Sequence, residues 1–294
     1  MRLLPGDIVR SIAGDVPLND DIRESLRTEL GLNRPLINQY MDWISTFPEG
    51  DFGGKSLESK EPIKDLLFRE LPVTLLFTSY SILISICISV PLGIYSAISK
   101  RQWVINLISI FSSAGMSIPN LCMGLLTLII VMTLFNWSPP IIYTQPWLDP
   151  WNHFKMVFVP VLLVGWELSS PLIRIVRYSI LQNLQTTYIL TAHAKGLSPN
   201  SILLRHSLPN AITTPITMLG LQIGLLISSV VIMETLFGLP GIGRALIQAC
   251  LARDFPVIQT LSCCLILFSL LISLSVDIIS RLIHPSIGSD QDIA

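Results

Sequence analysis

Charged residues are scarce in this chain, and it has no basic stripe of the kind that binds nucleic acid. Asp, Glu, Lys and Arg make up only 13% of the 294 residues, whereas hydrophobic residues make up 51%. So apolar a composition excludes an ordinary soluble domain and indicates a polytopic α-helical membrane protein. The few positive charges stand at the ends of apolar segments, so we expect no nucleic-acid partner.

Cysteine is also scarce, and its spacing fits neither a disulfide framework nor a zinc site. The five cysteines include no C-x-x-C pair, and Cys87, Cys122, Cys263 and Cys264 lie inside apolar runs. We predict that these four are small buried hydrophobes. The sequence shows neither a cluster of His, Cys and carboxylates with metal-ligand spacing nor a motif of nucleophile and base. We therefore expect no metal, no cofactor and no catalytic residue.

One glycine-rich stretch looks like a phosphate-binding loop but lacks its spacing. Residues 50–56 read GDFGGKS, and a P-loop would need a glycine at the position of Glu49. The sequence predicts no strand before the stretch and no long helix directly after it. We therefore do not expect this chain to bind ATP.

Five apolar segments are long enough to cross about 30 Å of hydrocarbon as helices. They cover residues 72–98, 104–135, 156–180, 211–233 and 256–283. Prolines at 91, 119, 160 and 171 interrupt or bound them, and helices broken at membrane depth usually lie inside a bundle or line a cavity. The predicted fold is an all-α polytopic membrane protein, with a small helical module in residues 1–70, a membrane domain in 71–285 and a tail in 286–294.

The basic residues of the short connections predict the orientation. One side has Lys100, Arg101, Arg174, Arg177, Lys195, Arg205 and Arg281, and the other has Lys155, Arg244 and Arg253. The positive-inside rule places the side with seven basic residues in the cytoplasm. Residues 1–70 and 234–255 are then extracytoplasmic, and residues 181–210 and 286–294 are cytoplasmic.

The strongest functional signal is the polar, basic interval 188–211, YILTAHAKGLSPNSILLRHSLPNA. It predicts a short helix that ends at Gly196, and a second helix that Ser198 and Pro199 begin and Pro209 stops. Gly196, nine further residues and then HSLP resemble the cytoplasmic coupling loop of ABC importer permeases, most closely the peptide and nickel branch. Where the general pattern has Glu this chain has Leu190, and His206 replaces the usual Ile.

The resemblance implies that this interval docks in a groove of an ATPase subunit. The residues it would use are Ala192, Ala194, Lys195, Gly196, Arg205, His206, Leu208 and Pro209. The small residues would permit close contact, and the basic ones would pair with acidic groups of the partner. An ordinary cytoplasmic loop is the alternative.

The resemblance continues through residues 234–259, ETLFGLPGIGRALIQACLARDFPVIQ. The glycines and Pro240 predict a turn that leads to a short amphipathic helix at the outer surface. In the resembled family this segment lies near the mouth of the pathway and the docked binding protein. Candidate contacts are Glu234, Arg244, Arg253 and Asp254, with plain solvated charges as the alternative.

Glu167 is an acidic residue in the middle of a predicted span, where an ionised group costs about 2.5–3.5 kcal/mol. We expect it to face the interior of the bundle. There it either lines the pathway and meets a cationic amine or metal complex, or accepts an interhelical hydrogen bond from Ser, Thr or Asn. Asn120 and Gln222 are weaker pathway candidates, and the small residues around Gly220 and Ser229 indicate helix packing.

The resemblance covers nearly all of the chain and implies a permease subunit without bond chemistry of its own. Its partners would be a second homologous permease, two ATP-binding subunits, an extracytoplasmic solute-binding protein and the lipid bilayer. The substrate would be peptide or, alternatively, nickel or another small solute. A secondary transporter would need ion-coupling groups and inverted repeats within one chain, which fits poorly; a remnant that transports nothing is the other alternative.

The family usually has a further span before a sequence like LPGD at residues 4–7, so a first helix is expected to be missing here. A start assigned too late, a truncated chain and a true variant with five spans would each explain it.

Overall fold

The computed structural model describes residues 22, 24, 25, 28, 33–48, 50–139 and 142–283. Within these residues the regular elements are helices, and the one β-bridge joins Lys55 and Pro62. The chain divides into two compact units, residues 1–74 with 240–267, and residues 75–239 with 268–294. Most of the first 32 residues of the expected N-terminal module lie outside the described residues, and so does the expected tail 286–294.

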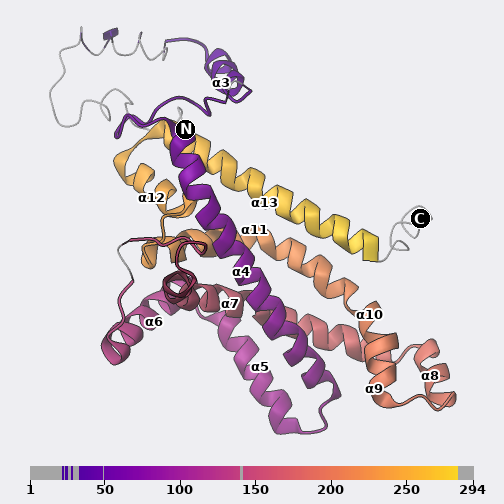
Figure 1. The fold of residues 1–294 in the computed structure, drawn as a ribbon. Helices are drawn as coiled ribbons and strands as arrows, with labels where there is room; N and C mark the ends of the chain where they lie inside the picture. Colours follow the sequence, from indigo (N-terminus) through magenta and orange to yellow (C-terminus); the bar gives the residue numbers. More distant parts are fainter. Residues whose placement is uncertain are drawn as a thin grey trace. The chain divides into compact units, whose positions relative to one another are not determined.

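The first unit combines the N-terminal module with the segment before the last span. It holds α3 (Leu36–Ser45), the start of α4 (Ile63–Ile98), α12 (Ile242–Ala252) and the start of α13 (Phe255–Ile283) (Figure 1). Helix α3 begins directly after Pro35. Edge-to-face ring contacts of 4.8–6.0 Å run through Trp43, Phe47, Phe52 and Phe68 and join α3 to α4.

The glycine-rich stretch 50–56 is a packed turn in this unit. Gly53 has φ +94°, and a Cβ there would lie 2.8 Å from both Thr260 Oγ1 and Trp43 Nε1. Thr260 Oγ1 also donates a hydrogen bond to the carbonyl of Phe52 (2.9 Å). Both the positive φ and the lack of space require glycine, so the stretch packs its backbone onto the first turns of α13.

The second unit holds most of the long apolar helices. It contains the rest of α4, α5 (Gln102–Ser117), α6 (Asn120–Phe135), α7 (Pro150–Leu184), the short helices between residues 187 and 211, α11 (Thr213–Leu236) and the rest of α13. In the described part of the chain four helices, α4, α7, α11 and α13, are long and apolar enough to cross a membrane. The pair α5 and α6 makes a fifth span if it is counted as one, which agrees with the predicted fold class.

The predicted span 104–135 is not one straight helix. Helices α5 and α6 meet at a bend of 106°. Ile118, which precedes Pro119, has an extended conformation (ψ 120°), because the proline ring disfavours the helical conformation in the preceding residue. Pro160 and Pro171 instead lie within the continuous helix α7. Pro119 therefore interrupts its predicted span, whereas Pro160 and Pro171 do not interrupt theirs.

Helix α7 contributes more buried hydrophobic residues to the second unit than any other helix, including Val164, Leu168, Leu172, Val176 and Ile180. Its Gly165 allows close approach of α4, since a Cβ there would lie 2.5 Å from Ile84 Cγ2. The cysteines differ from the prediction. Cys264 is half-buried and the other four are exposed on this chain, because apolar side chains of a spanning helix are free to face lipid or a neighbouring subunit.

Candidate functional site

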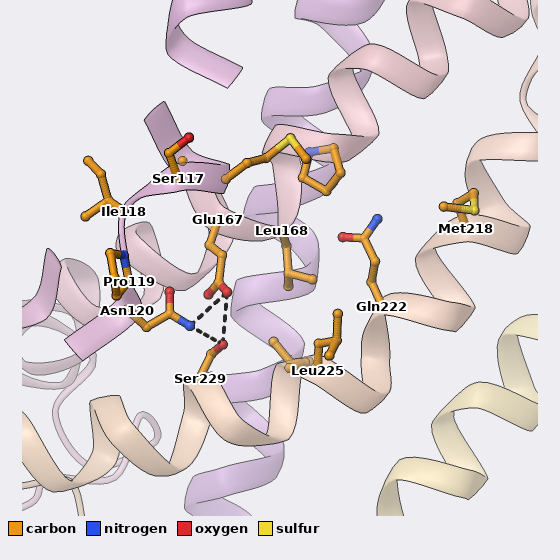
Figure 2. Close-up of a pocket in the computed structure, with 14 residues that line it drawn as sticks. Ser117, Ile118, Pro119, Asn120, Glu167, Leu168, Met218, Gln222, Leu225 and Ser229 are labelled. Atoms are coloured by element: carbon orange, nitrogen blue, oxygen red, sulfur yellow. Dashed lines mark hydrogen bonds between the residues drawn. The ribbon is translucent and has the colours of Figure 1, made fainter. Parts of the chain in front are cut away.

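A cavity of about 510 Å³ opens among α5, α6, α7 and α11 within the second unit. All three residues predicted for the pathway, Asn120, Glu167 and Gln222, line it. Leu168 and Leu225 contribute to its apolar wall. Figure 2 shows the polar side chains at this cavity, with the carboxylate of Glu167 close to Asn120.

The bend at Pro119 places the first residue of α6 beside the middle of α7. Asn120 Nδ2 donates to Glu167 Oε1 (2.8 Å), and Ser229 Oγ of α11 donates to the same oxygen (3.2 Å). Asn120 Nδ2 also donates to Ser229 Oγ (2.7 Å). The interhelical hydrogen bond expected for Glu167 is therefore present, and the same side chain lines a cavity. These three residues join three helices around one carboxylate.

The sequence analysis assigned Ser229 to helix packing and missed its polar contact. One signal was available, because Ser229 follows Gln222 by two helical turns and so lies on the same face of α11. For Gly220 the packing prediction is confirmed, since a Cβ there would lie 3.2 Å from Val276 Cγ1 of α13.

Two polar atoms at the cavity have no hydrogen-bond partner in the described part of the chain. They are the second carboxylate oxygen, Glu167 Oε2, and the amide nitrogen Gln222 Nε2, both buried. An unsatisfied buried polar atom costs about 1–3 kcal/mol. Both atoms are enclosed by the chain, so a molecule bound in the cavity reaches them only when neighbouring side chains shift.

The predicted coupling interval folds as two short helices around a glycine. Helix α8 (Thr187–Ala194) ends in a Schellman motif, in which the Gly196 amide donates to His193 (2.9 Å) and the Leu197 amide to Ala192 (3.3 Å). Gly196 has φ +77°. Helix α9 (Pro199–Ser201) is capped by Ser198, whose hydroxyl accepts from the Ser201 amide (3.4 Å). The glycine break and the second start are as predicted.

The predicted stop at Pro209 is wrong. A π-helical segment, η1 (Ile202–Ser207), runs directly into α10 (Leu208–Ala211), and α11 begins two residues later. Proline lacks an N–H and clashes with the carbonyl four residues before it. The wider π turn before Pro209 lets the helical path continue through it.

The residues predicted to contact an ATPase differ in exposure. Ala192 is only 6% exposed and packs with Ile189 and Ile202, so it holds α8 onto η1. Ala194, Lys195, Gly196, Arg205 and Pro209 are exposed, and His206 and Leu208 are partly exposed. Two large apolar side chains, Leu190 (60%) and Leu204 (57%), are also exposed on this hairpin. The accessible surface of residues 187–211 is thus apolar with basic residues.

Two of the four charged residues predicted to touch a binding protein are buried. Asp254 is 3% exposed, and its Oδ2 accepts from Ser56 Oγ (2.5 Å) and the amides of Leu57 (3.0 Å) and Glu58 (3.3 Å). Glu234 is 0% exposed. Neither carboxylate is placed to touch a partner, because each is enclosed by its own chain. Arg253 is exposed and Arg244 is partly exposed.

Residues 89–289 match the family described as binding-protein-dependent transport system inner membrane component. The chain is 33% identical over 290 residues to the glutathione transport system permease protein GsiC of Escherichia coli and of Shigella dysenteriae. These alignments cover 98% of this chain and 90% of each relative.

Two solved structures share the fold. The MetNI methionine ABC transporter in an inward-facing conformation has a TM-score of 0.58 at 21% identity, over 76% of this chain and 99% of that chain. An amino acid ABC transporter with histidines has a TM-score of 0.54 at 18% identity, over 74% and 94%. With its bent helix pair, its spanning helices and this sequence identity, the chain belongs to the binding-protein-dependent inner membrane components and is a permease subunit of an ABC importer.

Proposed function

We propose that this permease passes short peptides through the membrane domain, and that the cavity at Glu167 is part of their route. One observation carries the proposal. The cavity wall combines Asn120, Glu167, Gln222 and Ser229, and two of their polar atoms lack partners in the described residues. Peptides carry an ammonium group and amide groups that suit a cavity wall with a carboxyl group, two side-chain amides and a hydroxyl. The relatives at 33% identity are named for glutathione, which is a tripeptide.

ATP hydrolysis takes place on partner subunits in this proposal. An importer of this family works with an ATPase and a binding protein, and we infer two ATPases and a second homologous permease. The hairpin 187–211 would meet one ATPase through exposed residues such as Leu190, Lys195 and Leu204. A compact hairpin anchored at both ends moves as a unit when its binding groove closes.

The orientation follows from the basic residues of the connections. The hairpin 187–211 and the C-terminal tail would be cytoplasmic, and residues 1–70 and 234–255 extracytoplasmic. The solute-binding protein would then dock on the outer side, where the exposed Arg253 and the partly exposed Arg244 are the candidate contacts.

An uptake assay tests the proposed function. A strain without other peptide importers would express the complete transporter and receive labelled tripeptide, glutathione or nickel ions. We expect ATP-dependent accumulation of peptide, strongly reduced by Glu167→Gln, because the amide removes the negative charge but keeps the shape. Ser228→Ala is the matched control, since Ser228 is exposed on α11 and does not line the cavity. Uptake of nickel without any peptide would contradict the proposal.

A further inference from the structure

The geometry points to a second charged anchor for the substrate. We propose that Glu167 and Arg174 hold the two ends of a short zwitterionic peptide, with the ammonium at Glu167 and the carboxylate at Arg174. The inference rests on the proposed function and adds the preferred substrate, a linear peptide of about three residues with both termini free.

Arg174 is a charged residue in a spanning helix whose partners here are neutral. Its Nε donates to Ser112 Oγ (3.2 Å) and its Nη2 to Ser113 Oγ (2.6 Å), both on α5. Ser112 is itself fixed by donating to the carbonyl of Ser170 (2.5 Å). The two hydroxyls orient the guanidinium without neutralising its charge. The side chain of Arg174 remains exposed on this chain.

Neither charge has a counter-charge in the described part of the chain. Arg34 pairs with Asp42, and Arg69 pairs with Glu61 and Glu70, but all five residues belong to the first unit. Ionisable side chains within spanning helices face the bundle interior or a water-filled cavity, and they pair with one another or with backbone groups. A zwitterionic ligand supplies both missing charges at once.

The two charges lie on one face of α7. Side chains spaced three or four residues apart lie on the same face of a helix. Pro171 follows Glu167 by four residues, and Arg174 follows Pro171 by three. Pro171 lines the cavity between them. On α5, Ser117 also lines the cavity, and Ser113, one turn earlier, contacts Arg174. The arginine therefore lies one turn beyond the cavity wall, toward the end of α7 that leads into the hairpin 187–211.

The spacing of the two residues along α7 selects a length. Seven residues of helix rise about 10 Å, and an extended peptide advances about 3.3–3.6 Å per residue. Three residues therefore span about 10 Å, whereas a dipeptide is about 3 Å short and a single amino acid cannot reach both ends. Gln222 also lines the cavity, and a side-chain amide can hydrogen-bond to a peptide group.

The test is equilibrium binding of labelled trialanine to the purified permease and ATPase complex in nanodiscs, without the binding protein. Trialanine is compared with its N-acetyl and C-amide forms and with dialanine and pentaalanine. Glu167→Gln should weaken binding of the free and amidated peptides about 10-fold or more, and leave the N-acetyl peptide unchanged. Arg174→Gln should weaken the free and acetylated peptides similarly and leave the amide unchanged. Arg174→Lys, which keeps the charge, should restore the preference for a free carboxylate.

A purely structural role for either residue would give a different pattern. It would weaken all peptides equally, because distorted helix packing does not distinguish a capped terminus from a free one. Arg101→Gln is the control, since it removes one exposed positive charge at the start of α5.

Equal losses for capped and free peptides, equal affinity for all lengths, or no binding of trialanine would overturn the inference. If the uptake assay shows peptide import while binding ignores the termini, only this inference fails. If no peptide is imported, the proposed function fails as well.

Discussion

The buried contact between Asp254 and the 56–58 turn gives a prediction whose magnitude follows from the structure. In Asp254→Ala, the Ser56 hydroxyl and the Leu57 and Glu58 amides lose a charged acceptor that now lies 2.5–3.3 Å away. A hydrogen bond to a charged group contributes about 1.5–3 kcal/mol. Because water can reach the partly exposed Glu58 amide, we count the two shorter contacts and expect a loss of about 3 kcal/mol in local stability.

Hydrogen exchange measured by mass spectrometry in nanodiscs checks this value. A loss of about 3 kcal/mol in opening free energy speeds exchange about 100-fold, and the effect should be confined to peptides that contain Leu57 and the start of α13. Arg253→Gln is the control, because Arg253 is the exposed neighbour of Asp254, and it should leave exchange unchanged. If Asp254→Ala exchanges like the wild type while remaining folded, the anchoring argument is refuted. Asp254→Asn, which keeps one acceptor oxygen, should fall in between.

Two further predictions concern the hairpin 187–211 and the connection between α6 and α7. Gly196→Trp should leave the protein in the membrane but abolish peptide-stimulated ATP hydrolysis, because a Cβ at this position meets nothing within 4 Å and the added ring must project from the surface. Gly196→Ala has the same strained φ without the bulk and should retain most of this ATPase activity. Normal stimulation of ATP hydrolysis in the Trp variant would contradict the assignment of this hairpin to ATPase contact. Burial, with a smaller effect of Tyr80, raises the pKa of Tyr143 to about 12, against about 10 for a free phenol. Since the phenol of Tyr143 ionises at a lower pH in the unfolded chain, its contribution to folding stability is complete below about pH 10 and is lost as pH rises through the folded pKa. An ultraviolet difference titration of the wild type against Tyr143→Phe should show a late phenolate step. A step at the ordinary pKa of tyrosine would disprove the shift.

Local sequence signals predicted much of the structure of the hairpin 187–211. Gly196 and the pair Ser198 and Pro199 act within one helical turn, and both a left-handed cap and a helix start are present there. The stop expected from Pro209 failed for a reason that no local pattern expresses. A π turn in the preceding residues accommodates the proline, and its formation depends on how η1 packs.

For the cavity, the sequence identified which residues are polar within apolar segments but not how they meet. Glu167, Asn120 and Gln222 were recognisable because polar groups are costly in a membrane. Their convergence depends on the bend at Pro119, which turns α6 so that Asn120 lies beside α7. Ser229 was missed because a serine is as suitable for helix packing as for a hydrogen bond, and only its neighbours distinguish the two.

The sequence by itself determined the membrane character, the helical fold class, the approximate positions of the spans and the family, because these depend on composition and on residues near one another in the chain. Only the tertiary structure decided which charged side chains are available to partners. Asp254 and Arg253 are adjacent in sequence, yet one is buried against Ser56, 198 residues away, and the other is exposed. Burial is a property of the packed chain, since it is set by contacts between segments whose separation no local pattern records.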